Sequence, residues 1–274
     1  MNNSLFYING AFVSSNEASV SVTDLALQRG YGIFDFFKII NGKPIFLDDH
    51  LDRFYSSASF MQLQAGKTKS EIKNIIRHLI QQNNILNSGI RITLTGGNSS
   101  DGYSISVPNL IITQQPLQLS KSFNTNGINL VTYQHQRQLS SAKTIDYVMA
   151  IWLQQYIQQQ HADDVLYHQN EIVTETPRAN IFIVTKDQKI ITPKHNILQG
   201  ITRKHIISVA AEKFQVKEAD ISLTDLTQAK EVFLTSTSKQ VMPVNSIDGI
   251  QIGNQNKEIS FWLYNRLISQ YNKS

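Results

Sequence analysis

The sequence predicts an α+β fold of two domains, a smaller N-terminal α/β domain and a larger C-terminal mixed domain. Short apolar segments of strand length are interspersed with longer segments of helical periodicity along the whole chain. The strands come in runs, without the regular strand and helix alternation of a doubly wound parallel sheet. A polar stretch without periodicity surrounds Pro116. We therefore expect domains over residues 1–115 and 127–274, joined by a connection at residues 116–126.

The first domain is expected to open with two hairpins. Asn-Gly pairs at residues 9–10 and 41–42 each separate two apolar runs, which is the strongest short hairpin signal. Apolar residues at helical spacing, preceded by two aspartates, predict a helix over residues 48–61. The other elements expected here are strands over residues 5–8, 11–13, 33–40, 43–46, 90–95 and 110–113, a helix over residues 70–83, and a Gly/Ser-rich loop at residues 96–102.

The second domain is expected to pair mostly antiparallel strands. Its helices are predicted over residues 145–160, 202–214 and 258–271, and Asp248-Gly249 marks a turn. The strands are predicted over residues 128–133, 165–167, 172–175, 181–184, 190–192, 232–235 and 241–244.

Composition narrows the function classes. The chain has no cysteine, which excludes disulfides and thiolate sites, and its 7 histidines show no metal-ligand spacing, so no metal is expected. A net charge of +4 without a basic stripe disfavours a nucleic-acid binder. The N-terminus lacks the pattern of a signal peptide, and no apolar run is long enough to span a bilayer. We expect a soluble cytoplasmic protein that does not bind membranes.

One segment is typical of phosphate binding. Gly200, Ile201 and Thr202 precede a helical apolar stripe, and free amides at a helix start, beside a hydroxyl, bind phosphate well. An ordinary helix cap is the alternative. Thr237 and Ser238 follow a predicted strand and add further donors, although such turns are common.

Taken in order, several blocks of the sequence resemble the class IV aminotransferase family. These are the fold type IV pyridoxal-phosphate enzymes, which include branched-chain and D-amino acid aminotransferases and aminodeoxychorismate lyase. The resemblance runs from Tyr7 to Gly249. The blocks are Arg-Gly-Tyr-Gly-Ile-Phe-Asp at residues 29–35, Asp-Asp-His-Leu-Asp-Arg at 48–53, Ser-Ala-Lys-Thr-Ile-Asp-Tyr at 141–147, and Val-Thr-Glu-Thr-Pro-Arg-Ala-Asn-Ile-Phe at 173–182.

The resemblance implies a pyridoxal 5'-phosphate cofactor bound to Lys143 as a Schiff base, with the freed lysine acting as a general base. It implies that Glu175 pairs with the pyridine nitrogen and that Tyr147, one helical turn beyond Lys143, bonds to the phenolic oxygen. Arg53, Ile201, Thr202 and Thr237 are implied phosphate contacts. Taken singly, each of these residues has a non-functional alternative. The charged residues Lys143, Arg53 and Glu175 would then be exposed to solvent, and Tyr147 would be an aromatic residue of the core.

The resemblance leaves the reaction open. Arg91 and Tyr147 resemble branched-chain aminotransferases, and the substrate-holding arginine and histidine of D-amino acid aminotransferases are missing from residues 98–104. Tyr103, in Asp-Gly-Tyr-Ser, resembles the lyases of folate biosynthesis, which release pyruvate and 4-aminobenzoate. Asp35, which is either a substrate contact or a strand residue facing solvent, stands where aminotransferases often have glutamate, and Ser238 is a further candidate substrate contact.

We favour an aminotransferase that acts on a small branched-chain-like or D-amino acid and a 2-oxo acid. The lyase is the alternative, and a catalytically silent cofactor-binding protein is a remote one. Because family members are dimers, the resemblance also implies a homodimer.

Overall fold

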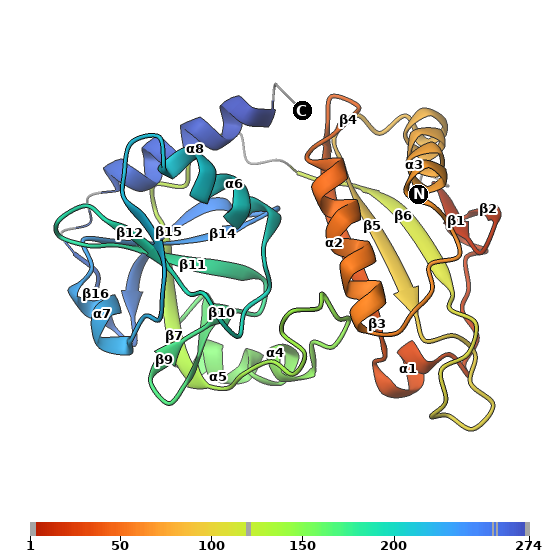
Figure 1. Cartoon of the computed structure of the whole chain (residues 1–274), viewed down its shortest axis with the longest axis horizontal. Coiled ribbons are helices and arrows are strands. Elements are labelled where there is room, and N and C mark those ends of the chain that lie inside the picture. The colour runs from red at the N-terminus through yellow and green to blue at the C-terminus, as the bar shows by residue number, and fades with distance from the viewer. Residues whose placement is uncertain (1–3, 119–121, 254, 256, 272–274) are drawn as a thin grey trace. The chain divides into compact units, whose positions relative to one another are not determined.

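The computed structural model of the chain describes residues 4–118, 122–253, 255 and 257–271 (Figure 1). The chain forms two compact units. The first unit comprises Met1–Leu119 and Ala142–Asp146, and the second comprises Ser120–Ser141 and Tyr147–Lys273. Each unit combines helices with a sheet, which confirms the α+β class. Within the predicted connection, residues 119–121 lie outside the described residues.

The first unit contains a six-stranded antiparallel sheet in the order β2-β1-β6-β5-β3-β4. Both predicted hairpins form, because Asn9 and Asn41 adopt the left-handed conformation that such tight turns require. The strands are β1 (Leu5–Ile8), β2 (Ala11–Ser14), β3 (Gly32–Ile40), β4 (Lys43–Pro44), β5 (Ser88–Thr95) and β6 (Leu110–Pro116).

Helices α2 (Leu47–Phe60) and α3 (Lys69–Asn83) pack on this sheet, as Figure 1 shows. Both were predicted, and α3 begins with a capping box between Thr68 and Glu71. Their buried residues join those of β3, β5 and β6 in one apolar core. A short helix, α1 (Leu25–Arg29), was not predicted.

The segment Ala142–Asp146 belongs to the first unit, although the sequence analysis placed it in the second domain. It runs beside the start of β3: the amide of Phe34 donates to the carbonyl of Lys143 (2.9 Å), and the amide of Ile145 donates to that of Gly32 (3.0 Å). Ile33 and Thr144 face each other in an antiparallel bridge. The prediction that Ile145 lies in a helix is therefore wrong, because these residues use their backbone groups in sheet pairing.

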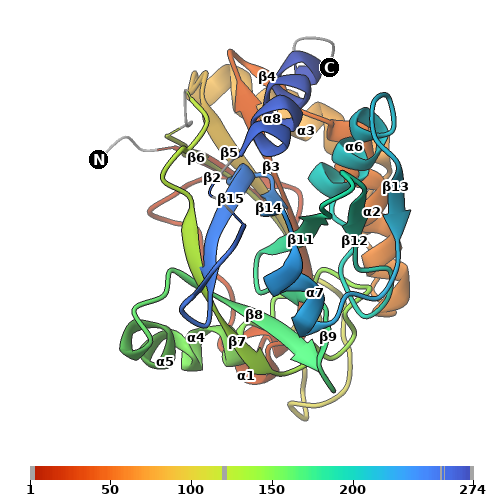
Figure 2. The ribbon, with the colours of Figure 1, turned by 90° about the vertical axis from the view of Figure 1, so that its left-hand side faces the viewer.

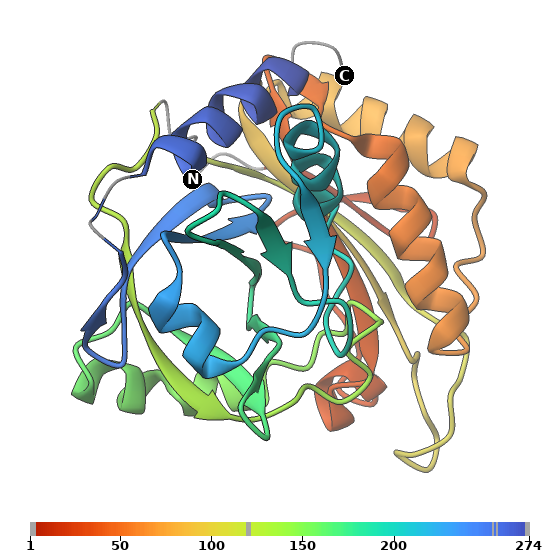
Figure 3. The same cartoon turned by 60° about the vertical axis from the view of Figure 1, so that its left-hand side comes forward.

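The second unit is built around a ten-stranded mixed sheet whose strands wrap around an apolar core (Figure 3). β7 pairs in parallel with β8 and β15, β12 pairs in parallel with β13, and the other pairings are antiparallel. The strands are β7 (Ile128–Gln134), β8 (Asp164–Gln169), β9 (Ile172–Val173), β10 (Glu175–Thr176), β11 (Ala179–Val184), β12 (Ile190–Thr192), β13 (Val216–Glu218), β14 (Glu231–Ser236), β15 (Gln240–Ile247) and β16 (Ile250–Gln251).

The helices of the second unit are α4 (Val148–Trp152), α5 (Gln154–Gln159), α6 (Ile201–Ala210), α7 (Leu223–Gln228) and α8 (Glu258–Tyr271). Helices α6 and α8 pack on each other and on β14, and Figure 2 shows both at the same end of this unit. The single helix predicted over residues 145–160 is replaced by α4 and α5, which meet at the buried Leu153. Among the described residues, no helix is long and apolar enough to cross a membrane.

Candidate active site

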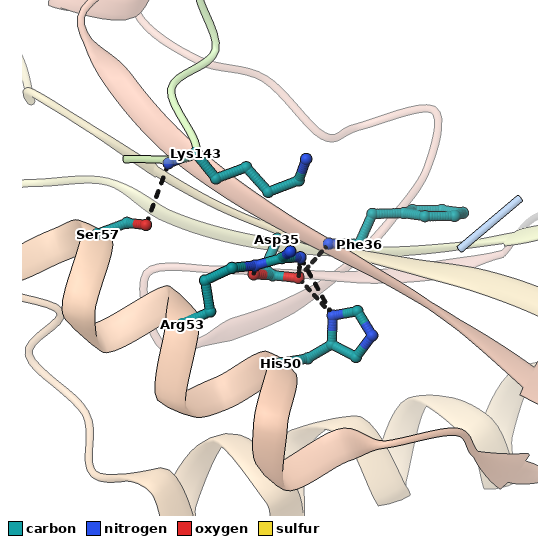
Figure 4. Close-up of polar contacts among 6 residues, drawn as sticks. All are labelled: Asp35, Phe36, His50, Arg53, Ser57 and Lys143. Carbon is teal, nitrogen blue, oxygen red and sulfur yellow. Dashed lines mark hydrogen bonds and ion pairs between the residues drawn. The ribbon is translucent and has the colours of Figure 1, made fainter. Parts of the chain in front are cut away.

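Lys143 lies on an extended segment at the edge of β3. Its amide donates to the buried hydroxyl of Ser57 on α2 (3.1 Å), and its carbonyl accepts from Phe34. Figure 4 shows this anchoring and the side chain of Lys143 extending beyond it. Both backbone groups are thus fixed, so the amine is carried on a rigid base. The expectation that Tyr147 lies one helical turn beyond Lys143 is wrong, because α4 begins only after Tyr147.

A buried charged cluster underlies this segment. Asp35, on the core-facing side of β3, is fully buried; its carboxylate accepts from Nε of Arg53 (2.8 Å) and Nη2 of Arg53 (2.9 Å) and bonds to Nδ1 of His50 (2.7 Å). Arg53 and His50 come from successive turns of α2 (Figure 4). A buried charge must be paired and hydrogen-bonded to persist, and Asp35 meets both conditions.

The cluster fixes the protonation of its members. Burial by itself raises the pKa of Asp35, but Arg53 and His50 outweigh it and hold the pKa of this carboxyl well below its usual range. Burial lowers the pKa of His50, against the opposing effect of Asp35. Nδ1 of His50 donates to the charged carboxylate of Asp35. The alternatives of a solvent-facing Asp35 and a solvated Arg53 are wrong.

The ring of Phe34 links Lys143 to a second cation. Nζ of Lys143 lies 4.5 Å from the centre of this ring, and the guanidinium carbon of Arg91 lies 4.0 Å from it. Arg91 stands on β5, where it pairs across the sheet with Phe36. The first unit therefore places an amine and an exposed guanidinium against one aromatic ring.

Glu175 anchors the polar site of the second unit. The side chain is 4 % exposed, so the alternative of a solvated carboxylate is wrong. Its Oε1 accepts from Nε of Arg137 (2.8 Å), and its Oε2 accepts from the amide of Leu198 (3.0 Å). Arg137 also donates to the carbonyl of Ser140 (2.9 Å). The carboxylate is held in one orientation from two sides.

The start of α6 forms the other part of this site. Gly200 is the N-cap residue of α6, as the capping alternative also expects, and it provides no side-chain hydrogen bond to the first turn. Thr202 is buried in the first turn. Thr235, at the end of β14, is 2 % exposed, and its Oγ1 has no hydrogen-bond partner among the described residues. It pairs across the sheet with Asn180, whose side chain faces Gly200.

These features fit a pyridoxal phosphate molecule. The second unit combines a buried carboxylate, suited to a protonated pyridine nitrogen, with an uncapped helix start and an unpaired hydroxyl, suited to a phosphate. Taken by itself, the first unit carries a primary amine, that of Lys143, on a fixed backbone, and such an amine can form a Schiff base with an aldehyde. No group of acidic residues and histidines within the described ranges is arranged to hold a metal ion.

The remaining predicted site residues are less defined. Tyr147 is the N-cap residue of α4. Thr237 and Ser238 lie in the turn between β14 and β15, where the hydroxyls of Ser236 and Ser238 are 3.5 Å apart. Tyr103 is 86 % exposed in the loop between β5 and β6, with its amide bonded to Asp101. Their functional roles stay predictions.

Sequence reasoning did not identify several residues of the site. Arg137 and Asn180 support Glu175 and its surroundings, His50 completes the Asp35 cluster, and Thr235 presents the unpaired hydroxyl. His50 and Asn180 lie in the blocks used for the resemblance, and Thr235 ends the strand predicted over residues 232–235, but the sequence gives no sign of their partners. Arg137 carries no local signal at all.

Comparison with known sequences shows the family of the chain. The profile described as Amino-transferase class IV matches residues 32–247. A D-alanine aminotransferase of Staphylococcus haemolyticus is 35% identical over 257 residues, which cover 90% of this chain and 90% of that protein. A D-alanine aminotransferase of Listeria monocytogenes serotype 4b (strain F2365) is 31% identical over 255 residues, covering 89% of this chain and 88% of that protein.

Solved structures share the fold. The branched-chain amino acid aminotransferase from Escherichia coli superimposes with a TM-score of 0.90 at 22% identity, covering 98% of this chain and 95% of that one. A second branched-chain amino acid aminotransferase, from T.th., was solved with pyridoxamine 5'-phosphate; it gives a TM-score of 0.90 at 23% identity, covering 100% of this chain and 95% of that one.

Proposed function

Given that the chain belongs to the class IV aminotransferase family and is a pyridoxal-phosphate-dependent aminotransferase for small amino acids, we propose that D-alanine or a D-amino acid of similar size is its amino donor and a 2-oxo acid its acceptor. The donor is supported by the 35% identity with a D-alanine aminotransferase over 90% of both chains. The aminotransferase prediction is confirmed, and branched-chain substrates are the main competitors.

The observation that carries the site assignment is the fixed backbone of Lys143, whose amine lies against Phe34. We propose that this amine would attach the cofactor and, once released, would remove the proton from the α-carbon of the substrate and deliver it to the cofactor carbon to which the amine had been joined. Bonding of its amide to Ser57 holds the amine in reach through both steps.

Glu175 is proposed to keep a proton on the pyridine nitrogen. Its fixed carboxylate, held by Arg137 and the amide of Leu198, is suited to a cationic N–H. When bound, pyridoxal phosphate supplies the electron sink that stabilises negative charge at the substrate α-carbon and carries the amino group. The ring proton retained by Glu175 strengthens that sink.

Phosphate binding is proposed for Ile201, Thr202 and Thr237, together with the hydroxyl of Thr235. A phosphate at the uncapped start of α6 receives amide hydrogen bonds and the favourable field of the helix. Arg53 stays a proposed phosphate partner. Its bonds to Asp35 use only part of the guanidinium donors, so it keeps capacity for further oxygens.

Arg91 is proposed to bind the substrate carboxylate. Its guanidinium and the amine of Lys143 lie against the same ring, and a planar guanidinium can hold two carboxylate oxygens at once. Because Asp35 is fully buried, we propose it as the support of Arg53 and not as a substrate contact. Tyr147, Tyr103 and Ser238 remain candidates from the resemblance.

The test is a panel of D- and L-amino acids, with and without a 2-oxo acid, together with aminodeoxychorismate. We expect product only when an acceptor is present, and fastest with D-alanine. Release of pyruvate and 4-aminobenzoate without an acceptor would establish the lyase instead. Fastest turnover of an L-branched-chain amino acid would contradict the donor proposal, and no turnover of any kind would favour the silent binding protein.

Borohydride reduction followed by peptide mapping tests the lysine assignment. We expect the label on Lys143 and a loss of about 10³-fold or more in turnover for Lys143→Ala. Lys189→Ala is the matched control, since Lys189 is an exposed lysine paired with Asp187. A label on another lysine would overturn the assignment.

A homodimer is also proposed. Large apolar side chains are exposed on two segments of the first unit that are joined by the bond from the Ser99 amide to the Thr23 carbonyl; they are Val20, Val22, Leu27, Tyr103, Ile105 and Val107. A second copy would remove them from water. Light scattering should give twice the mass of the chain. The cytoplasmic location also stays a prediction.

A further inference from the structure

Asn180 lies between the two parts of the second unit's polar site. It stands on β11, 4 % exposed, directly opposite Glu175 in the β10–β11 pairing. On its other side, its side chain faces the loop that leads into α6. Two anchors are proposed in this unit: the Glu175 carboxylate for the pyridine nitrogen and the start of α6 for the phosphate. Asn180 is part of neither anchor, but its side chain contacts residues of both.

The backbone of Leu198 is held at both its amide and its carbonyl. Nδ2 of Asn180 donates to the carbonyl of Leu198 (2.8 Å), while the amide of Leu198 donates to Oε2 of Glu175 (3.0 Å). Nδ2 of Asn180 also reaches Oε2 of Glu175 at 3.5 Å. Leu198 is therefore tied to Glu175 directly and through Asn180.

The other end of the Asn180 side chain packs on the helix start. A Cβ atom added to Gly200 would lie 2.1 Å from Oδ1 of Asn180, a distance that no real contact allows. Gly200 is the N-cap residue of α6 and follows Leu198 by two residues. The single amide of Asn180 thus sets the path of the loop from Leu198 to the first turn of α6.

We propose that Asn180 is a positioning residue that sets the distance and orientation between the Glu175 carboxylate and the amide groups at the start of α6. This inference rests on the proposed function, in which those two groups hold the pyridine nitrogen and the phosphate of one molecule. A rigid ligand with both groups gains affinity only when the two anchors are aligned in advance. A ligand with one group needs no such alignment.

The two kinds of ligand give a test that loss of stability alone would not reproduce. Apo protein with Asn180 or with Asn180→Ala is titrated with pyridoxal 5'-phosphate, with pyridoxal, and with inorganic phosphate. We expect Asn180→Ala to weaken pyridoxal 5'-phosphate binding by about tenfold or more. Pyridoxal and inorganic phosphate, each using one anchor, should weaken by less than about threefold.

Asn180→Leu is the second variant. It keeps a side chain of similar size and adds no charge beside Glu175, but it has no group that can donate to the Leu198 carbonyl. It should show the same selective loss, and it keeps the test available if Asn180→Ala does not fold. Asn83→Ala is the matched control, because Asn83 makes three side-chain hydrogen bonds in the first unit. It should lower the melting temperature while all three affinities stay unchanged.

The outcomes separate the inference from the proposed function. Equal weakening of pyridoxal and pyridoxal 5'-phosphate would mean that Asn180 acts only through Glu175, and would overturn the positioning role. Unchanged affinity for pyridoxal 5'-phosphate in both variants would overturn it too. If the unaltered protein binds no pyridoxal 5'-phosphate, the proposed function itself fails, and the inference with it.

Discussion

Buried polar groups are treated differently in the two units. In the first unit, Asp35, His50 and Arg53 satisfy one another within a single cluster. In the second unit, α6 starts without a side-chain cap and Thr235 buries a hydroxyl without a partner. The buried side-chain atoms that lack a hydrogen-bond partner in the described ranges all lie in the second unit: His168 Nδ1, Thr235 Oγ1, Asn245 Oδ1 and Arg266 Nε.

This difference indicates which unit needs a ligand to complete the hydrogen bonds of its buried polar groups. A satisfied ionic cluster holds its geometry without help, although removing one member leaves a buried charge unpaired. An unsatisfied buried donor destabilises the folded protein until something accepts its hydrogen bond. We therefore expect the first unit to be a prepared support for Lys143, and the second unit to gain most from binding a phosphate.

The largest expected effect concerns the satisfied cluster. Asp35→Asn removes the negative charge between Arg53 and His50 and should lower the free energy of unfolding by about 3–5 kcal/mol at neutral pH. Denaturant unfolding followed by fluorescence measures it. Asp48→Asn, at an exposed ion pair with Lys73, is the control and should change little. An equal loss of stability in both variants would show that the buried cluster contributes no more than an exposed ion pair.

The same variant has a pH signature. Because the pKa of Asp35 is lowered in the folded state, its contribution to stability is present above the unfolded pKa of about 4 and is lost as the pH falls. The unaltered protein should lose stability between about pH 5 and pH 3 more steeply than Asp35→Asn. Parallel pH profiles would contradict the charged state assigned to Asp35.

A buried lysine on β3 gives the next effect. Burial lowers the pKa of Lys38 to about 7, so above that pH the unfolded chain binds a proton that the folded chain does not. The free energy of unfolding should rise by about 2 kcal/mol between pH 7 and pH 9, since one pKa unit corresponds to about 1.4 kcal/mol. Lys38→Met should remove this rise, whereas Lys69→Met, at an exposed lysine, should keep it. A rise that persists in Lys38→Met would have another origin.

Local signals predicted much of the first unit. The Asn-Gly turns and the acidic helix start are encoded within a few residues, and the structure confirms both hairpins and α2. The helix predicted over residues 145–160 failed for a non-local reason. Residues near Lys143 bond to β3, about a hundred residues earlier in the chain, and no periodicity in the segment itself reveals that pairing.

The residues of the site show the same division between local signals, which the sequence carries, and non-local contacts, which it does not. Lys143, Arg53 and Glu175 were singled out through the resemblance, but the pairing of Arg53 with Asp35 joins a helix to a strand and had no sequence signal. The importance of Asn180 and Thr235 also follows only from the strand register, which places them opposite each other. Residue types could be predicted, whereas the partners of buried polar groups required the three-dimensional structure.

The smallest effect tests the unsatisfied hydroxyl. Thr235→Val replaces the unpaired Oγ1 with a methyl group of similar shape, so the apo protein should be as stable as before, or more stable by up to about 1 kcal/mol. Pyridoxal 5'-phosphate should then stabilise the variant less, by about 1 kcal/mol, which corresponds to roughly fivefold weaker binding. Melting temperatures with and without the cofactor measure both quantities.

Thr192→Val is the matched control for this substitution. The Thr192 hydroxyl already donates to the Ile181 carbonyl (2.8 Å) and accepts from Nε of Arg203 (3.3 Å), so its loss should destabilise the apo and cofactor-bound proteins alike. If the cofactor stabilises Thr235→Val as much as the unaltered protein, the phosphate does not reach this hydroxyl. The open hydrogen-bonding capacity of the second unit would then have no part in cofactor binding.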